Sequence, residues 1–591
     1  MADERITDFN LKYDLIDLTA LNDAAISTSD NSQIATITKL KTESNFPDYM
    51  TWEHNHNILD GNLVHFTNST LNPSNNNIAF FSSGKSDSNG DFTSNPIIDI
   101  SFTEAHTSIG LTLYFVDDSP LNMRVTWKNS GELLTTEEFS ITSKVCFIDK
   151  SVKMYDQIIL EFTKAVPDRY IKMYYILFGK QYTWDETVLK SGKLVQEINM
   201  LGDMISINTL NFEVIDVDNT LNFGSSQNVI EYFTRLQPMY PEIVINDEST
   251  FLGKYYLEKV TSENNIASFK AFSAIGLLDN VAFNDGTIYE NTPAGEVIEV
   301  IFSLAGITSY TIDTATYNTG LYGTIKPCTC REALQKILFV CGSIVRSNSS
   351  DYQIIIEQPT TSLANKIARD VKINTKVSDA EYVTGVKLAY TMYELKDAEE
   401  KISTDTYDAG THLIIFSNPY TNVRLDDTSV TITESNTYYI KFTVPTRRSI
   451  TIYGTGYNTI TSDIIVKRTS MKIGAIENVK SFSTDLCDYL QASSVAYRVL
   501  NYYITSSLDI SIKTLADNNT MMGKQIVANS VENLSNYVGR YTSRVFDLTG
   551  GFIDDSKLVG YYANAGINEY YATGDESFQH KEDMYTGDYL I

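Results

Sequence analysis

The chain has 591 residues, which at roughly 150 residues per domain predicts about four domains and excludes a single compact core. Its 74 acidic residues outnumber 46 basic residues, giving a net charge of −28, and a surface of this sign repels nucleic-acid backbones. Hydrophobic residues make up 42%, enough for folded cores, which excludes an acidic disordered chain. With 38 Tyr and 27 Phe, the composition favours strands over helices.

The N-terminal residues are charged from the third position and lead into no apolar stretch, so we expect no secretory signal. No run approaches 18 apolar residues, so we expect no spanning helix. Five cysteines are too few for a disulfide scaffold in a chain of this length. We therefore expect a soluble protein, made in the cytoplasm with reduced thiols.

Residues 97–162 contain short, closely spaced strand patterns with no long helix between them, which favours a β-sandwich or jelly roll. The strands are predicted at 97–102, 110–115, 125–127, 145–148 and 157–162, after a short one at 78–81.

From about residue 190 helical patterns appear among the strands, at Glu296–Leu304 and Arg331–Cys341, which is typical of an α+β region. Thr329 and Glu332 form a capping box before the second helix, and Gly342 ends it.

Residues 390–470 return to strands, with the strongest patterns at 438–444, 449–454 and 464–466. Apolar spacing then predicts the longest helix from Phe482 to Tyr503. From Tyr561 the chain carries six acidic residues against one lysine, which indicates an extended arm.

No phosphate-binding glycine loop, nucleophile elbow or H-E-x-x-H motif is present. His54 and His56 with Asp60 are the minimum for a metal site, but a solvated strand face explains them more simply. Cys328, Cys330 and Cys341 lack a matching second pair, so we interpret them as structural thiols. We predict no enzyme: no catalytic residue, no metal and no cofactor.

Several early segments together resemble the N-terminal sandwich of tail proteins in phages and prophages of Gram-positive bacteria. That sandwich is similar to a galactose-binding-like jelly roll. The resemblance rests on residues 52–61, 86–92, 108–115, 167–172 and 176–179.

The later segments resemble hub proteins at the base of long phage tails. They are residues 197–200, 206–218, 251–257, 329–335, 482–503, 522–527 and 548–552. Many hubs lack the N-terminal sandwich, and the Gly-Asp usual in the family is Gly523-Lys524 here.

The resemblance implies a mainly β fold with α+β parts: a jelly-roll sandwich, then hub-type β-barrel modules with short helices and one long helix. Its domains would be a galactose-binding-like sandwich at 1–185, a first hub part at 190–390, an inserted β domain at 391–470, a closing hub part at 471–560 and an acidic arm at 561–591.

The implied function is a structural hub in the baseplate or tail tip of a virion or a phage-tail-like bacteriocin. Hubs of this family form homotrimeric rings that join the tail tube, through the distal tail protein, to spike or fibre proteins. We expect no specific nucleic-acid binding, and three copies of a −28 chain predict an anionic conduit to which DNA does not adhere.

Two alternatives remain. The sandwich could bind cell-wall carbohydrate through aromatic faces at Trp52, Tyr114 and Trp127, although aromatic residues at such positions more often fill a core. A tail-tip peptidoglycan hydrolase is the other alternative.

Overall fold

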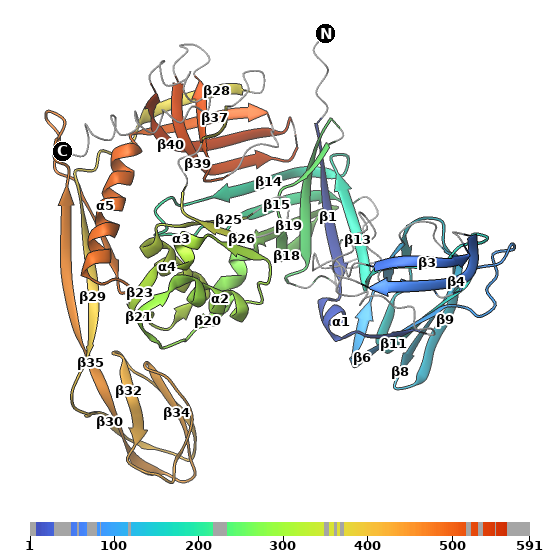
Figure 1. The fold of residues 1–591 in the computed structure, drawn as a ribbon, viewed down its shortest axis with the longest axis horizontal. Helices are drawn as coiled ribbons and strands as arrows, with labels where there is room; N and C mark the ends of the chain where they lie inside the picture. Colours follow the sequence, from blue (N-terminus) through green and yellow to red (C-terminus); the bar gives the residue numbers. More distant parts are fainter. Residues whose placement is uncertain are drawn as a thin grey trace.

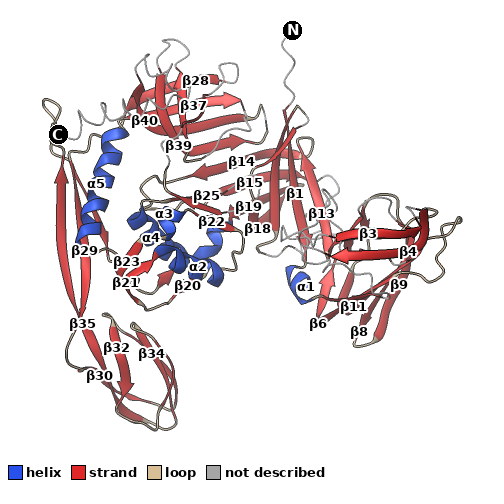
Figure 2. Cartoon of the chain, viewed as in Figure 1, coloured by secondary structure: helices blue, strands red, loops and turns tan. Residues whose placement is uncertain are grey.

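The computed structural model describes residues 7–28, 49–55, 58–67, 80–82, 84–115, 120–216, 221, 233, 235–246, 248–347, 354–359, 363–366, 372–515, 522–529, 536–549 and 551–563. The fold is mainly β with α+β parts, as predicted (Figures 1 and 2). The predicted acidic arm lies, from residue 564 onward, outside the described residues.

The centre of the fold is one long sheet whose strands come from both ends of the chain. Neighbouring strands along its path are antiparallel, in the order β13-β1-β16-β18-β19-β15-β14-β39-β40-β37-β28, with β17, β27 and β38 attached beside it. The strands are β1 (Thr7–Ile16), β13 (Gly179–Asp185), β14 (Leu189–Glu197), β15 (Thr209–Ile215), β16 (Pro238–Ile245), β17 (Glu248–Phe251), β18 (Tyr255–Glu263), β19 (Ile266–Ser273), β27 (Leu363–Lys366), β28 (Lys372–Asp379), β37 (Leu508–Leu515), β38 (Gln525–Asn529), β39 (Asn536–Asp547) and β40 (Ile553–Ala563).

Two groups of strands meet where β14 pairs with β39, a junction called the seam below. Strands β14, β15, β19 and β18 lie on one side of the seam, and β39, β40, β37 and β28 on the other. An aromatic core covers one face of the first group, where the rings of Phe212 and Phe269 stack at 4.8 Å and Tyr13 stacks on Trp184 at 5.5 Å. The long sheet therefore buries one face and leaves the other exposed.

A two-sheet sandwich is formed by strands from the early part of the chain. Its sheets have the orders β2-β6-β11-β8-β9 and β10-β7-β12-β5, and a separate hairpin pairs β3 with β4. The strands are β2 (Ala25–Thr28), β3 (Tyr49–Asn55), β4 (Ile58–Thr67), β5 (Phe80–Phe81), β6 (Ile97–Ser108), β7 (Leu111–Phe115), β8 (Pro120–Asn129), β9 (Glu132–Ser140), β10 (Val145–Ile148), β11 (Val152–Ala165) and β12 (Lys172–Leu177).

The structure differs from the predicted limits of this domain at both ends. Strands β1 and β13, which fall inside the predicted span 1–185, pair with each other in the long sheet. Alternate β1 residues, Phe9, Leu11 and Tyr13, bury their side chains in the aromatic core of the long sheet. The sandwich is thus inserted between two neighbouring strands of the long sheet (Figure 1).

A helical layer lies beside the long sheet and contains both predicted short helices. Its elements are η2 (Ala274–Asn280), α2 (Ala294–Leu304), α3 (Thr314–Tyr317), α4 (Cys330–Cys341), β20 (Ala282–Phe283), β21 (Ile288–Pro293), β22 (Tyr310–Ile312), β23 (Gly320–Thr324), β24 (Cys328–Thr329), β25 (Ile344–Ser347) and β26 (Ile354–Glu357). The capping box of Thr329 and Glu332 and the left-handed Gly342 bound α4, which confirms that prediction.

The inserted β region is a lobe of short strands that projects from the body on a long ribbon (Figure 1). It contains β30 (Glu400–Tyr407), β31 (Gly410–Ile415), β32 (Tyr420–Leu425), β33 (Thr431–Ser435) and β34 (Tyr439–Val444). The ribbon pairs β29 (Gly385–Leu395) with the 20-residue strand β35 (Arg448–Lys467), and β36 (Val479–Thr484) lies parallel to β29.

The predicted start of the longest helix is wrong. Helix α5 spans Tyr489–Thr505, and Phe482 lies in β36, opposite Leu388. The side chain of Asp488 accepts a hydrogen bond from the Gln491 amide and fixes the helix start there. Among the described helices, none has the length and apolarity needed to cross a membrane.

Candidate functional site

The residues predicted to bind sugar do not form one exposed site. Trp127, on β8, is fully buried, and its ring meets Phe139 edge-on at 6.5 Å. Tyr114, on β7 in the opposite sheet, is 6% exposed and lies 5.4 Å from Tyr175. Trp52 lies on β3, opposite Val64, but the structure does not describe its side chain. Tyr114 and Trp127 therefore present no open face for stacking on a sugar.

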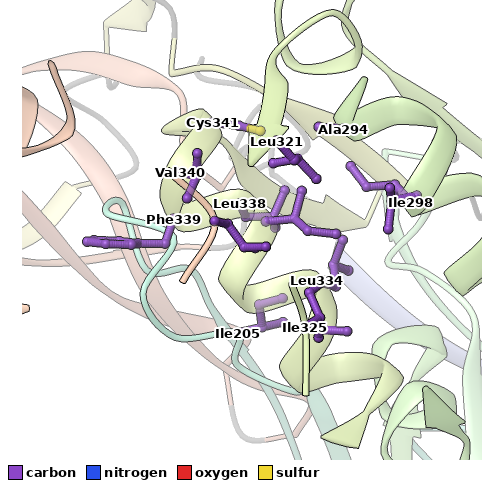
Figure 3. Close-up of a cluster of buried hydrophobic side chains, with 14 of the residues drawn as sticks. Ile205, Ala294, Ile298, Leu321, Ile325, Leu334, Leu338, Phe339, Val340 and Cys341 are labelled. Atoms are coloured by element: carbon purple, nitrogen blue, oxygen red, sulfur yellow. The ribbon is translucent and has the colours of Figure 1, made fainter. Parts of the chain in front are cut away.

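The histidine and cysteine clusters were considered as candidate metal sites. In the parts of the chain that the structure describes, no group of three His, Cys, Asp or Glu side chains is placed to hold a metal ion. The side chains of His54 and His56 lie outside those parts. Burial raises the pKa of the Cys341 and Cys487 thiols to about 12, and both pack in the helical core (Figure 3). Cys341, one of the three thiols predicted to be structural, is thus buried among apolar side chains.

The strongest buried polar cluster lies at the seam. The Arg544 Nε donates to Asp554 Oδ2 at 2.5 Å, and the two side chains are 4% and 1% exposed. The Ser556 hydroxyl donates to the other Asp554 oxygen at 2.8 Å. Because a buried charge is costly without a partner, this pair links β39 and β40 specifically.

The same cluster crosses the seam. Arg544 stands directly opposite Gln196 of β14, and the Gln196 side chain hydrogen bonds with Tyr255. Burial raises the pKa of Tyr255, while Gln196 and Arg544 act in the opposite direction. The long sheet is curved, since β1 and β13 run across the direction of β14 and β15 (Figure 1).

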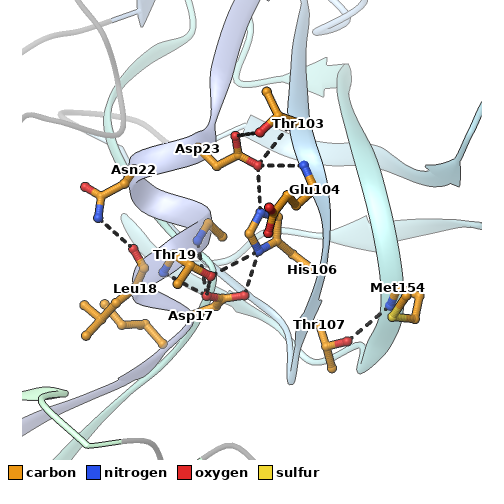
Figure 4. Close-up of polar contacts among 12 residues, drawn as sticks. Asp17, Leu18, Thr19, Asn22, Asp23, Thr103, Glu104, His106, Thr107 and Met154 are labelled. Atoms are coloured by element: carbon orange, nitrogen blue, oxygen red, sulfur yellow. Dashed lines mark hydrogen bonds and ion pairs between the residues drawn. The ribbon is translucent and has the colours of Figure 1, made fainter. Parts of the chain in front are cut away.

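A second polar cluster joins the sandwich to the long sheet (Figure 4). After β1, the chain forms the short helix α1 (Leu18–Asp23), which Asp17 caps by accepting from the amides of Thr19 and Ala20. His106 of the sandwich strand β6 is 5% exposed and lies between two carboxylates. Its Nδ1 is 3.0 Å from Asp17 Oδ2, and its Nε2 is 3.0 Å from Asp23 Oδ2. The imidazole thereby fixes both ends of α1 to the sandwich.

Acid is expected to release α1 only well below the usual range of an aspartate. Hydrogen bonds from the Thr103 hydroxyl, the Glu104 amide and His106 lower the pKa of Asp23 far below its ordinary value. A lowered folded-state pKa stabilises the fold above the unfolded value, about 3.9, and this contribution is lost as the pH falls through the folded value. Amide exchange at Thr103 and Glu104, corrected for intrinsic rates, should therefore remain slow from pH 7 to about pH 4. Asp23→Asn should accelerate it at pH 7; unchanged exchange in that variant would contradict this role.

The exposed face of the long sheet is less acidic than the chain as a whole. One row crosses five strands in register: Lys259, Lys270, Asn211, Lys193 and Asp547. Lys193 lies 3.9 Å from Asp547.

Within the described residues, both ends of the long sheet's main path are open: β13 pairs only with β1, and β28 pairs only with β37. Each open edge presents unpaired backbone groups that another strand can bond. Long, curved and open at both ends, the sheet has the geometry of a segment of a larger closed wall.

Comparisons with known proteins give only matches of low sequence identity and low TM-score. No protein-family model matches the chain, and no curated protein matches it. Among solved structures, the tail protein from Neisseria meningitidis MC58 matches with 10% identity and a TM-score of 0.39, over 64% of this chain and 93% of that chain. The 43 kDa tail protein of prophage MuSo2 from Shewanella oneidensis matches with 8% identity and a TM-score of 0.36, over 64% and 94%. The prophage tail protein gp18 from Listeria monocytogenes EGD-e matches with 8% identity and a TM-score of 0.36, over 66% and 95%. Chains from a phage P2 baseplate also match, with 7% and 8% identity and TM-scores of 0.25 and 0.24.

Proposed function

We propose that this chain is a structural hub of a phage or bacteriocin tail tip or baseplate. Three copies form a ring that lines the conduit and joins the tail tube above to spike or fibre proteins below. Its place is the virion, and its partners are copies of itself and neighbouring tail proteins.

The observation that carries this proposal is the curved long sheet with two open edges. A curved sheet with unpaired ends is completed when copies arranged around an axis bring those ends together, and such rings close at a fixed number of subunits. The segments that resemble hub proteins support the same assignment, because they lie in or beside this sheet. Residues 197–200 follow β14, residues 251–257 cover the start of β18, and residues 548–552 connect β39 to β40.

Carbohydrate recognition by the sandwich is less well supported. It would need open aromatic faces, whereas Trp127 and Tyr114 are buried. Saturable binding of the full-length chain on a glycan array would support carbohydrate recognition.

The mass of the purified full-length assembly tests the proposal. We expect a species three times the 66.4 kDa of one chain, by native mass spectrometry or light scattering. Crosslinking within an intact particle should then place the chain next to tube and fibre proteins. Strict monomers at all concentrations, or crosslinks to capsid proteins alone, would contradict it.

A further inference from the structure

The loop between β35 and β36, residues 468–478, presents an unusual set of exposed apolar side chains. Ile473 is fully exposed, Ile476 is 86% exposed and Met471 is 58% exposed. Three large apolar side chains within six residues form a patch, and exposed apolar patches generally mark contact sites.

The base of this loop is firmly held. The Lys472 amide donates to the Tyr382 hydroxyl at 2.9 Å, and the Arg468 guanidinium lies 4.4 Å from the centre of the same ring. Arg468 also donates to the carbonyls of Val383 and Tyr503, at 2.6 and 3.0 Å.

The backbone at the tip of the loop forms a defined turn. Gly474 has φ 79°, and the Ala475 amide donates to the Lys472 carbonyl at 3.0 Å, closing a turn that presents Ile473. An apolar anchor that is already ordered loses little conformational entropy on binding, which is the property of effective interface anchors.

The charge around the loop is opposite to that of the chain. Residues 467–480 contain four basic residues and one acidic residue, so their net charge is +3 in a chain of −28. Lys467 pairs with Glu477 at 2.6 Å and Lys480 with Glu381 at 2.7 Å. The Lys472 ammonium lies 5.2 Å from the centre of the Tyr382 ring and has no ion pair among the described residues.

We propose that this loop docks on the acidic surface of a second copy of this chain, burying Ile473 and Ile476. The inference rests on the proposed ring and names one of its contacts. A second copy has a net charge of −28 and therefore attracts this basic loop. The loop and α5 lie at the opposite side of the molecule from the sandwich (Figure 1), which suits a head-to-tail contact that uses different patches on the two copies.

The test is sedimentation velocity of the full-length chain across concentration and salt. We expect the double variant Ile473→Asp, Ile476→Asp to weaken self-association by about 30-fold or more, because charged side chains replace central apolar anchors. Lys472→Glu should weaken it mainly at low salt. Leu133→Asp, at a 62% exposed position of the sandwich strand β9, is the matched control and should assemble normally. Unchanged circular dichroism and melting would confirm that each variant folds.

The outcomes separate this inference from the proposed function. A ring that the double variant forms as readily as the unmodified chain contradicts only the role of the loop. An unmodified chain that stays monomeric contradicts the ring as well. Cosedimentation with phosphatidylglycerol vesicles that depends on Ile473 would overturn the assignment in favour of a lipid surface.

Discussion

Asp554→Ala is expected to lower the stability of the β39–β40 pair beside the seam by about 3–5 kcal/mol, because it leaves the buried Arg544 charge without its partner. The loss should first affect the pairing of β39 with β40, because Arg544 and Asp554 lie on these neighbouring strands. Amide hydrogen exchange in these strands should accelerate by about a hundredfold to several thousandfold.

A double variant provides the control for this experiment. Replacing both charges by apolar residues, Arg544→Met with Asp554→Leu, removes the unpaired charge and should restore exchange to within about 1 kcal/mol of the unmodified chain. Slow exchange in the single variant would show that Arg544 finds another acceptor, and the ion pair would then not hold the β39–β40 pair.

Gly179→Ala is expected to cause the second large loss of stability. Gly179 lies where the chain leaves the sandwich and enters β13. Gly179 has φ 152°, and a Cβ there would lie 2.1 Å from the Leu15 carbonyl oxygen and 2.7 Å from Ile16 Cα. Both contacts are backbone atoms of β1, so no side chain can move aside. We expect a loss of about 2–6 kcal/mol from backbone strain and steric overlap together. Calorimetry should show a lower melting temperature, with faster exchange in β1 and β13.

Gly410→Ala separates the two causes. Gly410 has φ 139°, yet nothing lies within 4 Å of a Cβ at that position. This variant should show backbone strain alone, about 1–3 kcal/mol. Equal losses at both glycines would mean that the close approach of β1 to β13 contributes nothing.

The sequence predicts those parts of this fold that local signals determine. The α4 helix carries its start and stop in Thr329, Glu332 and Gly342, and the structure confirms all three. The strands of the sandwich alternate over short ranges, and they too were predictable. Phe482 misled the helix prediction because its spacing suits a helix, whereas its register with Leu388 depends on a strand almost 100 residues earlier.

The prediction covered only parts of β35. Residues 449–454 and 464–466 were predicted as separate strands, but one strand spans both. Gly456 is an interior residue of this strand, and a Cβ there would lie 2.5 Å from Glu400 Oε1 and 3.1 Å from the Tyr420 ring. The glycine admits neighbouring side chains instead of ending the strand. As a result, β35 runs unbroken from Arg448 to Lys467, inside the predicted inserted domain.

The two polar clusters had no usable sequence signal. Gln196 and Arg544 are 348 positions apart, and no local pattern pairs them. Asp17 precedes a helix of only six residues, too short for apolar periodicity to reveal. His106 lies in β6 beyond the segment predicted as a strand, and its two carboxylate partners are more than 80 residues away. Such contacts are set by long-range pairing of strands.

The pairing of β14 with β39 also has a consequence for biosynthesis. The β14 edge is complete at Glu197, but its partner strand ends at Asp547. At about 5–20 residues per second, the ribosome needs roughly 20 to 70 seconds to make the intervening 350 residues. During that interval the first half of the sheet has an open hydrogen-bonding edge while other nascent copies on the same message have the same edge. Synthesis of this chain therefore leaves a strand edge open to pairing with other nascent copies for this interval.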